Sequence, residues 1–311
     1  MASLTPIPTG DGSSTFYSET FGEWFHSREG ARNEAQKTYV EASQLVRRAR
    51  TISESNKHLS ADANHAQQAL KILDVCYGLG YNTAADLEAI WTVVPDCPVV
   101  IKALEIDIEV PRSAIAQNLL HNYSVKVQQI LKVLSEQQSV EQPGCIVQLL
   151  LGDARQHIQQ IIEASWQADV VFLDPFSPPH CPQLWTVEFL QQVAQCLHPE
   201  GGALVAYSCE AAVRTALMQC GLSIGDISAG GRKWPGTIAS YDAVGLPSSS
   251  QQAQEHLQTR AAVPYRDPSL RDAAEEILAR RAKEQASSEL MPTAPWRRRW
   301  KEIATESSEI E

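Results

Sequence analysis

Long apolar runs are missing from this sequence, and none approaches the roughly 20 residues that a membrane-spanning helix needs. The first residues, MASLTPIPTGDGSS, contain no basic residue and no apolar stretch of the kind that marks a secretory signal. These two absences predict a cytoplasmic protein without a membrane partner.

Residues spaced to bind a metal are also missing. The seven cysteines are scattered and never form a CxxC motif, and the eight histidines form no pair at helical spacing. Unpaired, scattered cysteines are typical of reduced cytosolic proteins. The pattern therefore predicts neither a disulfide framework nor a metal site.

Positive charge is scarce, with 26 Lys and Arg against 37 Asp and Glu and a net charge of −11. Such an excess of negative charge argues against nonspecific binding of nucleic acid. The positive charges are unevenly placed, however. They gather at residues 47–50, at Arg232 and Lys233, and in the tail from Arg280 to Lys301. The sequence therefore leaves open a local basic face on an otherwise acidic protein.

The stretch KILDVCYGLGYNTAADLE, residues 71–88, organises the rest of the chain. It predicts a buried strand, a tight turn at Gly78 and Gly80, and a helix that opens near Asn82. Glycine lets the backbone approach a ligand, and a helix N-terminus offers free N–H groups. Glu105 ends the next strand-like run, about 25 residues later, as in nucleotide-cofactor pockets.

Strands and helices alternate from this stretch onward. Further strands are expected at 99–105, 146–151, 168–174 and 203–207, with an antiparallel pair at 222–227 and 237–241. Helices are expected between the parallel strands, and alternation of this kind predicts an α/β fold with a mostly parallel, doubly wound sheet. The final strand is predicted to be antiparallel.

Two extensions flank this core. Residues 1–60 are expected to form a β-hairpin, within 10–28, and a helix from 29 to about 50. The core is assigned to residues 61–245. Residues 246–311 are expected to form a charged, helical C-terminal extension, with a helix over 269–287 and a basic-aromatic end at 296–300. Those segments could contact RNA, or could be solvated helices that cover the core.

Acidic residues follow the predicted strands in the order that an adenosyl cofactor requires. A carboxylate at Glu105 suits a ribose diol, and Gly152-Asp153-Ala154 suits an adenine ring. The turn at 78–82 lacks the full GxGxxG that a pyrophosphate prefers, which favours S-adenosylmethionine over NAD. Each residue alone has a structural alternative, such as a helix cap for Glu105 or an Asx turn for Asp153.

The best catalytic candidate is Asp174, at the end of the fourth strand and before Pro175-Phe176-Ser177-Pro178. A carboxylate beside a proline-stiffened aromatic loop suits a substrate that presents an amine on a flat ring. Asp174 would orient the amine and Phe176 would pack on the ring. The alternative is a buried turn with a capping aspartate.

Residues 10–245 resemble the methyltransferase domain of the MnmC family, the tRNA 5-methylaminomethyl-2-thiouridine methyltransferases. The matching segments are Asp11-Gly12-Ser13, Tyr17-Ser18, His26-Ser27, Gly30-Ala31, Glu34-Ala35, residues 78–82, Leu104-Glu105, residues 151–155, residues 173–178, Trp185 and residues 231–233. This set is fairly specific, because generic class I methyltransferases with the Rossmann-like fold share only the central segments.

The resemblance implies methyl transfer from S-adenosylmethionine to the amine of 5-aminomethyl-(2-thio)uridine at the tRNA wobble position. It implies Asp174 as the catalytic carboxylate, Arg232 and Lys233 as contacts to anticodon phosphates, and no FAD, because a second GxGxxG is missing. A stand-alone methyltransferase would need a separate upstream enzyme to make the amine. The complete predicted cofactor site is Gly78, Gly80, Asn82, Glu105, Ile106, Asp153, Ala154 and Asp174. The predicted substrate site is Pro175, Phe176, Ser177, Pro178, Arg232 and Lys233.

Two other functions fit parts of the pattern. Polyamine aminopropyltransferases share the ribose Glu, the Gly-Asp-Ala and the strand-four Asp, but their glycine loop is normally Gly-Gly-Gly-Asp-Gly, which this chain lacks. A non-catalytic RNA-binding protein could have kept the same fold. The intact set of Glu105, Asp153 and Asp174 argues against such decay.

Overall fold

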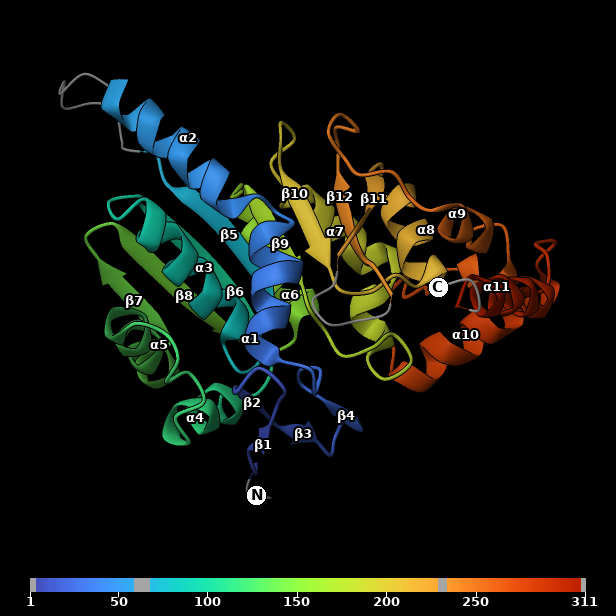
Figure 1. Cartoon of the computed structure of the whole chain (residues 1–311), viewed down its shortest axis with the longest axis horizontal. Coiled ribbons are helices and arrows are strands. Elements are labelled where there is room, and N and C mark those ends of the chain that lie inside the picture. The colour runs from blue at the N-terminus through green and yellow to red at the C-terminus, as the bar shows by residue number, and fades with distance from the viewer. Residues whose placement is uncertain (1–3, 59–67, 229–233, 309–311) are drawn as a thin grey trace.

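The computed structural model describes residues 4–58, 68–228 and 234–308, without the side chains of His58 and of 304–308. An eight-stranded sheet forms its centre (Figure 1). The parallel strands are β5 (Leu70–Val75), β6 (Val99–Glu105), β8 (Cys145–Leu151), β9 (Val170–Leu173) and β10 (Ala203–Ala206). The antiparallel strands are β7 (Ser139–Gln142), β11 (Ser223–Ile227) and β12 (Gly236–Ser240).

The strand order is β11-β12-β10-β9-β5-β6-β8-β7. The chain runs from β5 to β6 and β8 in one direction and then returns to β9 and β10 on the other side of β5. The order therefore reverses between β5 and β9, where Val75 pairs with Leu173. Ligands of doubly wound sheets bind outside the carboxyl ends of the strands at such a reversal.

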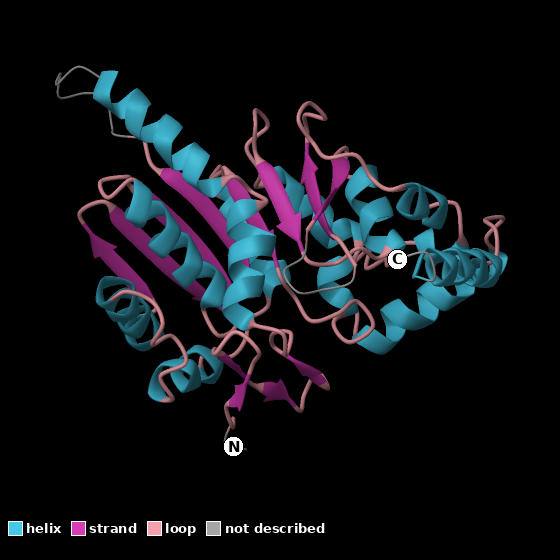
Figure 2. Ribbon diagram, viewed as in Figure 1, coloured by secondary structure: helices cyan, strands magenta, loops and turns pink. Residues whose placement is uncertain are grey.

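Helices cover both faces of the sheet (Figure 2). One face packs Ile72, Ile101 and Phe172 into a core, and the other packs Leu73, Val171 and Leu173 into a second core. This alternation explains why β9 is apolar throughout, since both of its faces are buried. The helices of the core are α3 (Tyr81–Val93), α4 (Glu109–Ala116), α5 (Val125–Gln137), α6 (Ala154–Glu163), α7 (Val187–Gln195) and α8 (Ala211–Gln219), with the 3-10 turn η2 (Pro182–Trp185).

The N-terminal residues form two small hairpins instead of one. They pair β1 (Ile7–Pro8) with β2 (Ser14–Thr15), and β3 (Tyr17–Ser18) with β4 (Glu23–Trp24). Asp11 ties the first hairpin to the following helix, because its carboxylate accepts hydrogen bonds from the N–H groups of Ser13 and Asn33. Both hairpins lie beyond the carboxyl ends of the parallel strands (Figure 1).

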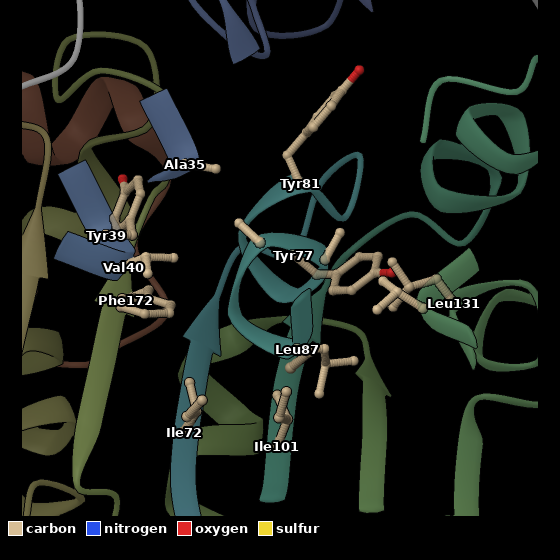
Figure 3. Packing of buried hydrophobic residues seen from close by; sticks show 14 of the residues in the cluster. Ala35, Tyr39, Val40, Ile72, Tyr77, Tyr81, Leu87, Ile101, Leu131 and Phe172 are labelled. Atoms are coloured by element: carbon tan, nitrogen blue, oxygen red, sulfur yellow. The ribbon is translucent and has the colours of Figure 1, made fainter. Parts of the chain in front are cut away.

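The helix after the hairpins is interrupted by a π-helix. It comprises α1 (Ala31–Glu34), η1 (Ala35–Glu41) and α2 (Leu45–His58). Figure 3 shows Ala35, Tyr39 and Val40 of η1 against the sheet, with the Tyr39 ring above Phe172. The two rings meet edge to face at 5.2 Å between centroids. This contact anchors η1 beside the end of β9.

The C-terminal residues form α9 (Gln251–His256), the short turn η3 (Arg260–Ala262), α10 (Ala274–Ser287) and α11 (Thr293–Ser308), which lie together at one side of the sheet in Figure 1. Trp296 of α11 stacks on His256 of α9 at 4.0 Å. The Trp300 Nε1–H of α11 donates to Glu255 of α9. Trp296 and Trp300, the aromatic residues of the predicted basic-aromatic end, therefore join α11 to α9.

The predicted fold class is confirmed, including the antiparallel pair at the end of the sheet. The edge strand β7 and the helix α8 were not predicted. β7 has one buried residue in Ser-Val-Glu-Gln, so its sequence is too polar to predict a strand. The helix predicted over 269–287 begins at Ala274. The domain boundaries at 60 and 245 stay a prediction.

The turn at Gly80 depends on the absence of a side chain. Gly80 has φ +85°, and a Cβ there would lie 2.6 Å from the hydroxyl oxygen of Tyr77, which is buried. We expect Gly80→Ala to lower the free energy of unfolding by about 3 kcal/mol, from left-handed strain and overpacking.

The matched control is Gly144→Ala, where φ is +74° but a Cβ would meet nothing within 4 Å. That variant should lose about 1 kcal/mol, from backbone strain alone. Urea unfolding of both variants measures the difference. Equal losses would show that the Tyr77 contact contributes nothing.

Candidate functional site

A cavity of about 710 Å³ lies at the strand reversal. Its floor is formed by residues that follow four neighbouring strands, at 76–78, 105–107, 152–155 and 174–177. The hairpin of β3 and β4 and the residues up to Arg28 form the facing wall. The sheet therefore brings together the strand ends that the sequence predicted, and the N-terminal extension covers them.

Glu105 and Gly78 meet in this floor. One Glu105 carboxylate oxygen accepts hydrogen bonds from the N–H groups of Ile106 and Asp107, and the other accepts from the N–H of Gly78 at 2.8 Å. Burial raises the pKa of Glu105, while these three bonds act in the opposite direction. The carboxylate is thus fixed at the end of β6, with Ile106 exposed beside it in the cavity wall.

Asp153 caps α6 and is held by Arg155. Its carboxylate accepts hydrogen bonds from the Arg155 backbone N–H and from the Arg155 guanidinium. The closest of these joins Nη2 of Arg155 to Oδ2 of Asp153 at 2.8 Å. Burial acts to raise the pKa of Asp153, but the bonds from Arg155 outweigh it and leave the pKa below its usual value. Asp153 therefore stays ionised, and Ala154 beside it also lines the cavity.

Asp174 follows β9 at the reversal. Its backbone N–H donates to the carbonyl of Val75, and one carboxylate oxygen accepts from the Asn82 side chain at 2.9 Å. Burial raises the pKa of Asp174 to about 6. The side chain is only half-buried, because one side of it faces the cavity.

The loop after Asp174 is fixed by hydrogen bonds to its backbone. The carbonyl of Pro175 accepts from the Tyr207 hydroxyl, and the carbonyl of Phe176 accepts from the Trp185 indole. The Phe176 ring stacks on Phe21 at 4.5 Å and meets Phe25 edge to face at 5.0 Å. An aromatic cluster from both the loop and the N-terminal wall therefore borders Asp174.

Glu23 of β4 joins the N-terminal wall to the same loop. Its two carboxylate oxygens accept from the backbone N–H of Ser177 at 2.8 Å and from the Ser177 hydroxyl at 2.5 Å. The hairpin also accepts a hydrogen bond at its Phe21 carbonyl from His180. These bonds make the wall a fixed part of the site.

Comparisons with known proteins agree with this geometry. Residues 113–242 match a family model described as S-adenosyl-L-methionine-dependent methyltransferase. The solved structure of MNMC2 from Aquifex aeolicus superimposes with a TM-score of 0.76 at 29% sequence identity, over 93% of this chain and 87% of that one. The predicted resemblance to the MnmC methyltransferases is confirmed.

Two curated relatives extend the comparison. An uncharacterized protein of Methanocaldococcus jannaschii is 27% identical over 85% of this chain and 67% of its own length. The bifunctional MnmC protein of an Acidovorax species is 25% identical over 68% of this chain, which spans 31% of that protein. The chain therefore matches about a third of the bifunctional relative.

This methyltransferase uses S-adenosylmethionine, as the strand ends predicted. The described residues fit such a cofactor, because Gly78 lines the cavity without a side chain and fixed carboxylates follow on the adjoining strands. Within the described ranges, no group of three His, Cys, Asp or Glu could hold a metal ion. In the same part of the chain, no helix is long and apolar enough to cross a membrane.

Several predicted site residues lie elsewhere than expected. Gly80 caps α3 under the Tyr77 ring, and Asn82 is buried behind Asp174, so neither lines the cavity and both support it from below. Pro178 is buried and also lies outside the lining. Arg232 and Lys233 lie outside the described residues.

Sequence reasoning missed the N-terminal wall and the C-terminal link. Glu23, Phe21 and Phe25 had no strand-end signal, since they precede the first core strand. Arg155 also donates to Asp267, which is fully buried in the C-terminal extension, at 2.9 Å. Arg155 belongs to a segment that matches the MnmC methyltransferases, but its buried partner lies 112 residues later and carries no local signal.

The contact between Glu23 and Ser177 can be tested directly. Glu23→Ala removes the acceptor of the Ser177 N–H, and a hydrogen bond to a charged group contributes about 1.5–3 kcal/mol. We expect hydrogen exchange at the Ser177 amide to accelerate by about 10- to 100-fold. Mass spectrometry of the peptide that contains this loop measures the exchange. Glu19→Ala, an exposed residue of the same hairpin, is the control and should leave exchange unchanged. Unchanged exchange in Glu23→Ala would contradict a fixed wall.

Proposed function

We propose that this methyltransferase transfers the methyl group of S-adenosylmethionine to the amine of 5-aminomethyl-(2-thio)uridine at the tRNA wobble position. The observation that carries the proposal is the cavity-facing carboxylate of Asp174, bordered by Phe176 and the other aromatic residues of the cluster. A carboxylate binds a primary amine, and an aromatic ring packs on a flat base. The MnmC names of the relatives point to the same substrate.

The cofactor would lie across the strand ends and would supply the methyl group. Glu105 would accept hydrogen bonds from the ribose hydroxyls, because its carboxylate already occupies the end of β6. Asp153 would accept a hydrogen bond from the exocyclic amine of adenine, and the Ala154 N–H would donate one to the adenine ring. Gly78 would let the backbone approach the cofactor without a side chain between them.

Asp174 would hold the amine in line with the methyl–sulfur bond, so that catalysis is largely positioning. Asn82 supports this role, because its side-chain amide donates to one carboxylate oxygen and so fixes the Asp174 side chain. The wobble base is already in a single-stranded loop, so its extrusion into the cavity costs little. Phe176 and Ser177 would border the base, and the buried Pro175 and Pro178 would stiffen the loop around them.

The tRNA itself would be bound by its anticodon loop. Arg232 and Lys233 are proposed to contact anticodon phosphates, which requires a local basic face on an acidic protein. A separate cytoplasmic enzyme would have to supply the aminomethyl group. Both proposals rest on the resemblance to the MnmC family.

The proposed activity is tested with labelled S-adenosylmethionine and tRNA that lacks only the final methyl group. We expect one label per tRNA, on the amine of the wobble uridine after nucleoside analysis. Label elsewhere, or none, would overturn the proposed substrate. Calorimetry separates the aminopropyltransferase alternative, which requires binding of the decarboxylated cofactor in preference to S-adenosylmethionine.

The role of Asp174 gives a second prediction. Asp174→Ala should bind S-adenosylmethionine with an unchanged dissociation constant but transfer the methyl group at least about 100-fold more slowly, because the amine is no longer positioned. Single-turnover kinetics and calorimetry measure the two quantities. Glu200→Ala, in an exposed turn, is the control. Wild-type turnover in Asp174→Ala would remove Asp174 from the catalytic site.

A further inference from the structure

His26 and Glu34 form a buried pair at the edge of the cavity. The Nδ1 atom of His26 lies 3.7 Å from a carboxylate oxygen of Glu34, and the side chains are 7% and 3% exposed. His26 lines the cavity, and Glu34 ends α1 behind it. A histidine that lies beside a buried carboxylate and lines a ligand cavity has the arrangement of a general base.

The position of His26 is fixed from other sides as well. Its backbone N–H donates to the Thr15 hydroxyl at 3.0 Å, and its ring meets Tyr81 edge to face at 5.2 Å between centroids. Glu34 is fixed in turn, because the same carboxylate oxygen accepts from the Ser27 N–H at 3.0 Å. The ring and its carboxylate thus keep their places in the absence of substrate.

Asp174 is close enough to interact electrostatically with this pair. Burial raises the pKa of Asp174, positive charge on His26 opposes that shift, and the charge of Glu34 adds to it. Positive charge on His26 likewise opposes the raised pKa of the buried Asp74. His26 thus contacts Glu34 of α1 and Tyr81 of α3, and it interacts electrostatically with Asp74 in β5 and with Asp174 after β9.

The proposed reaction needs a proton acceptor in addition to a positioning carboxylate. A primary alkylamine resembles the lysine side chain, with a pKa of about 10.4 in water, and so reaches the site as an ammonium ion. It has no lone pair for attack until one proton leaves. A carboxylate is a weak base, whereas histidine exchanges its proton between about pH 5 and 8.

We propose that His26 accepts this proton, that Glu34 is the positioning residue for its ring, and that Asp174 holds the amine. The inference rests on the proposed function. The ammonium N–H bond breaks and its proton moves to His26, most simply to Nε2, since Nδ1 lies toward Glu34. The nitrogen lone pair then forms the bond to the methyl carbon, and the electron pair of the methyl–sulfur bond stays on sulfur. The product is a secondary ammonium ion, and His26 returns its proton to solvent.

The test uses the full chain, S-adenosylmethionine and the tRNA that carries the aminomethyl group, in single-turnover reactions from pH 6 to 9.5. We expect His26→Asn to slow methyl transfer by about 100- to 1,000-fold at pH 7. Its rate should rise about tenfold per pH unit toward pH 9, because the substrate amine then loses its proton unaided. The wild-type rate should level off near neutral pH. Glu34→Gln should slow transfer by about tenfold, with the same cofactor affinity.

Two further measurements separate proton transfer from structure. Imidazole added to His26→Ala should restore the rate in a saturable way, which a misfolded site would not allow. His121→Asn, an exposed histidine between α4 and α5, is the control and should keep the wild-type profile. A loss in His26→Asn that is equal at every pH, without imidazole rescue, would overturn the inference.

The outcomes for the two proposals are distinct. A wild-type protein that methylates the amine, with His26 variants that keep the wild-type rate and pH profile, overturns the role of His26 and leaves the proposed function standing. A wild-type protein that binds S-adenosylmethionine but transfers no methyl group to this tRNA overturns the proposed function, and the role of His26 with it.

Discussion

The site depends on the parallel pairing of β5 with β9. This pairing sets the end of β9 against the end of β5, so that the Asp174 N–H donates to the Val75 carbonyl and the Asp174 carboxylate meets Asn82 at the start of α3. A shift of one residue would turn each side chain of β9 to the opposite face. The fit of particular side chains opposes such a shift, because the Phe172 ring packs on Tyr39 in one core and Leu173 packs in the other.

The carboxylates around the cavity differ because their surroundings differ. Asp153 is balanced by Arg155 and stays ionised, whereas Glu105 relies on three backbone N–H groups. Asp174 interacts with the Tyr39 hydroxyl and the Asn82 amide, but burial outweighs both and raises its pKa to about 6. The proposed roles of these three carboxylates, at the sugar, the base and the amine, differ in the same way. The neighbour of each carboxylate decides its chemistry.

Both extensions contribute to the site, although they lie outside the central sheet. The N-terminal hairpin supplies Glu23 and the aromatic residues that enclose the loop after Asp174. The C-terminal extension supplies Asp267, which shares Arg155 with Asp153. The Asp153 side of the cavity is thereby joined to the C-terminal residues, and the Asp174 side to the N-terminal residues. Removal of either extension would leave polar groups of the site without partners.

The sequence by itself determined the α/β class, most of the core strands and the acidic residues at their ends. Local patterns suffice for these, since an apolar run, a glycine turn and a following carboxylate are adjacent in the chain. Only the tertiary structure decided which of those residues face the cavity. It placed Asn82 and Gly80 behind the cavity wall, and it brought His26, Glu34 and Glu23 to the end of β9 from more than 100 residues away. Contacts of such separation follow from the packing of the sheet and leave no periodic signal in the sequence.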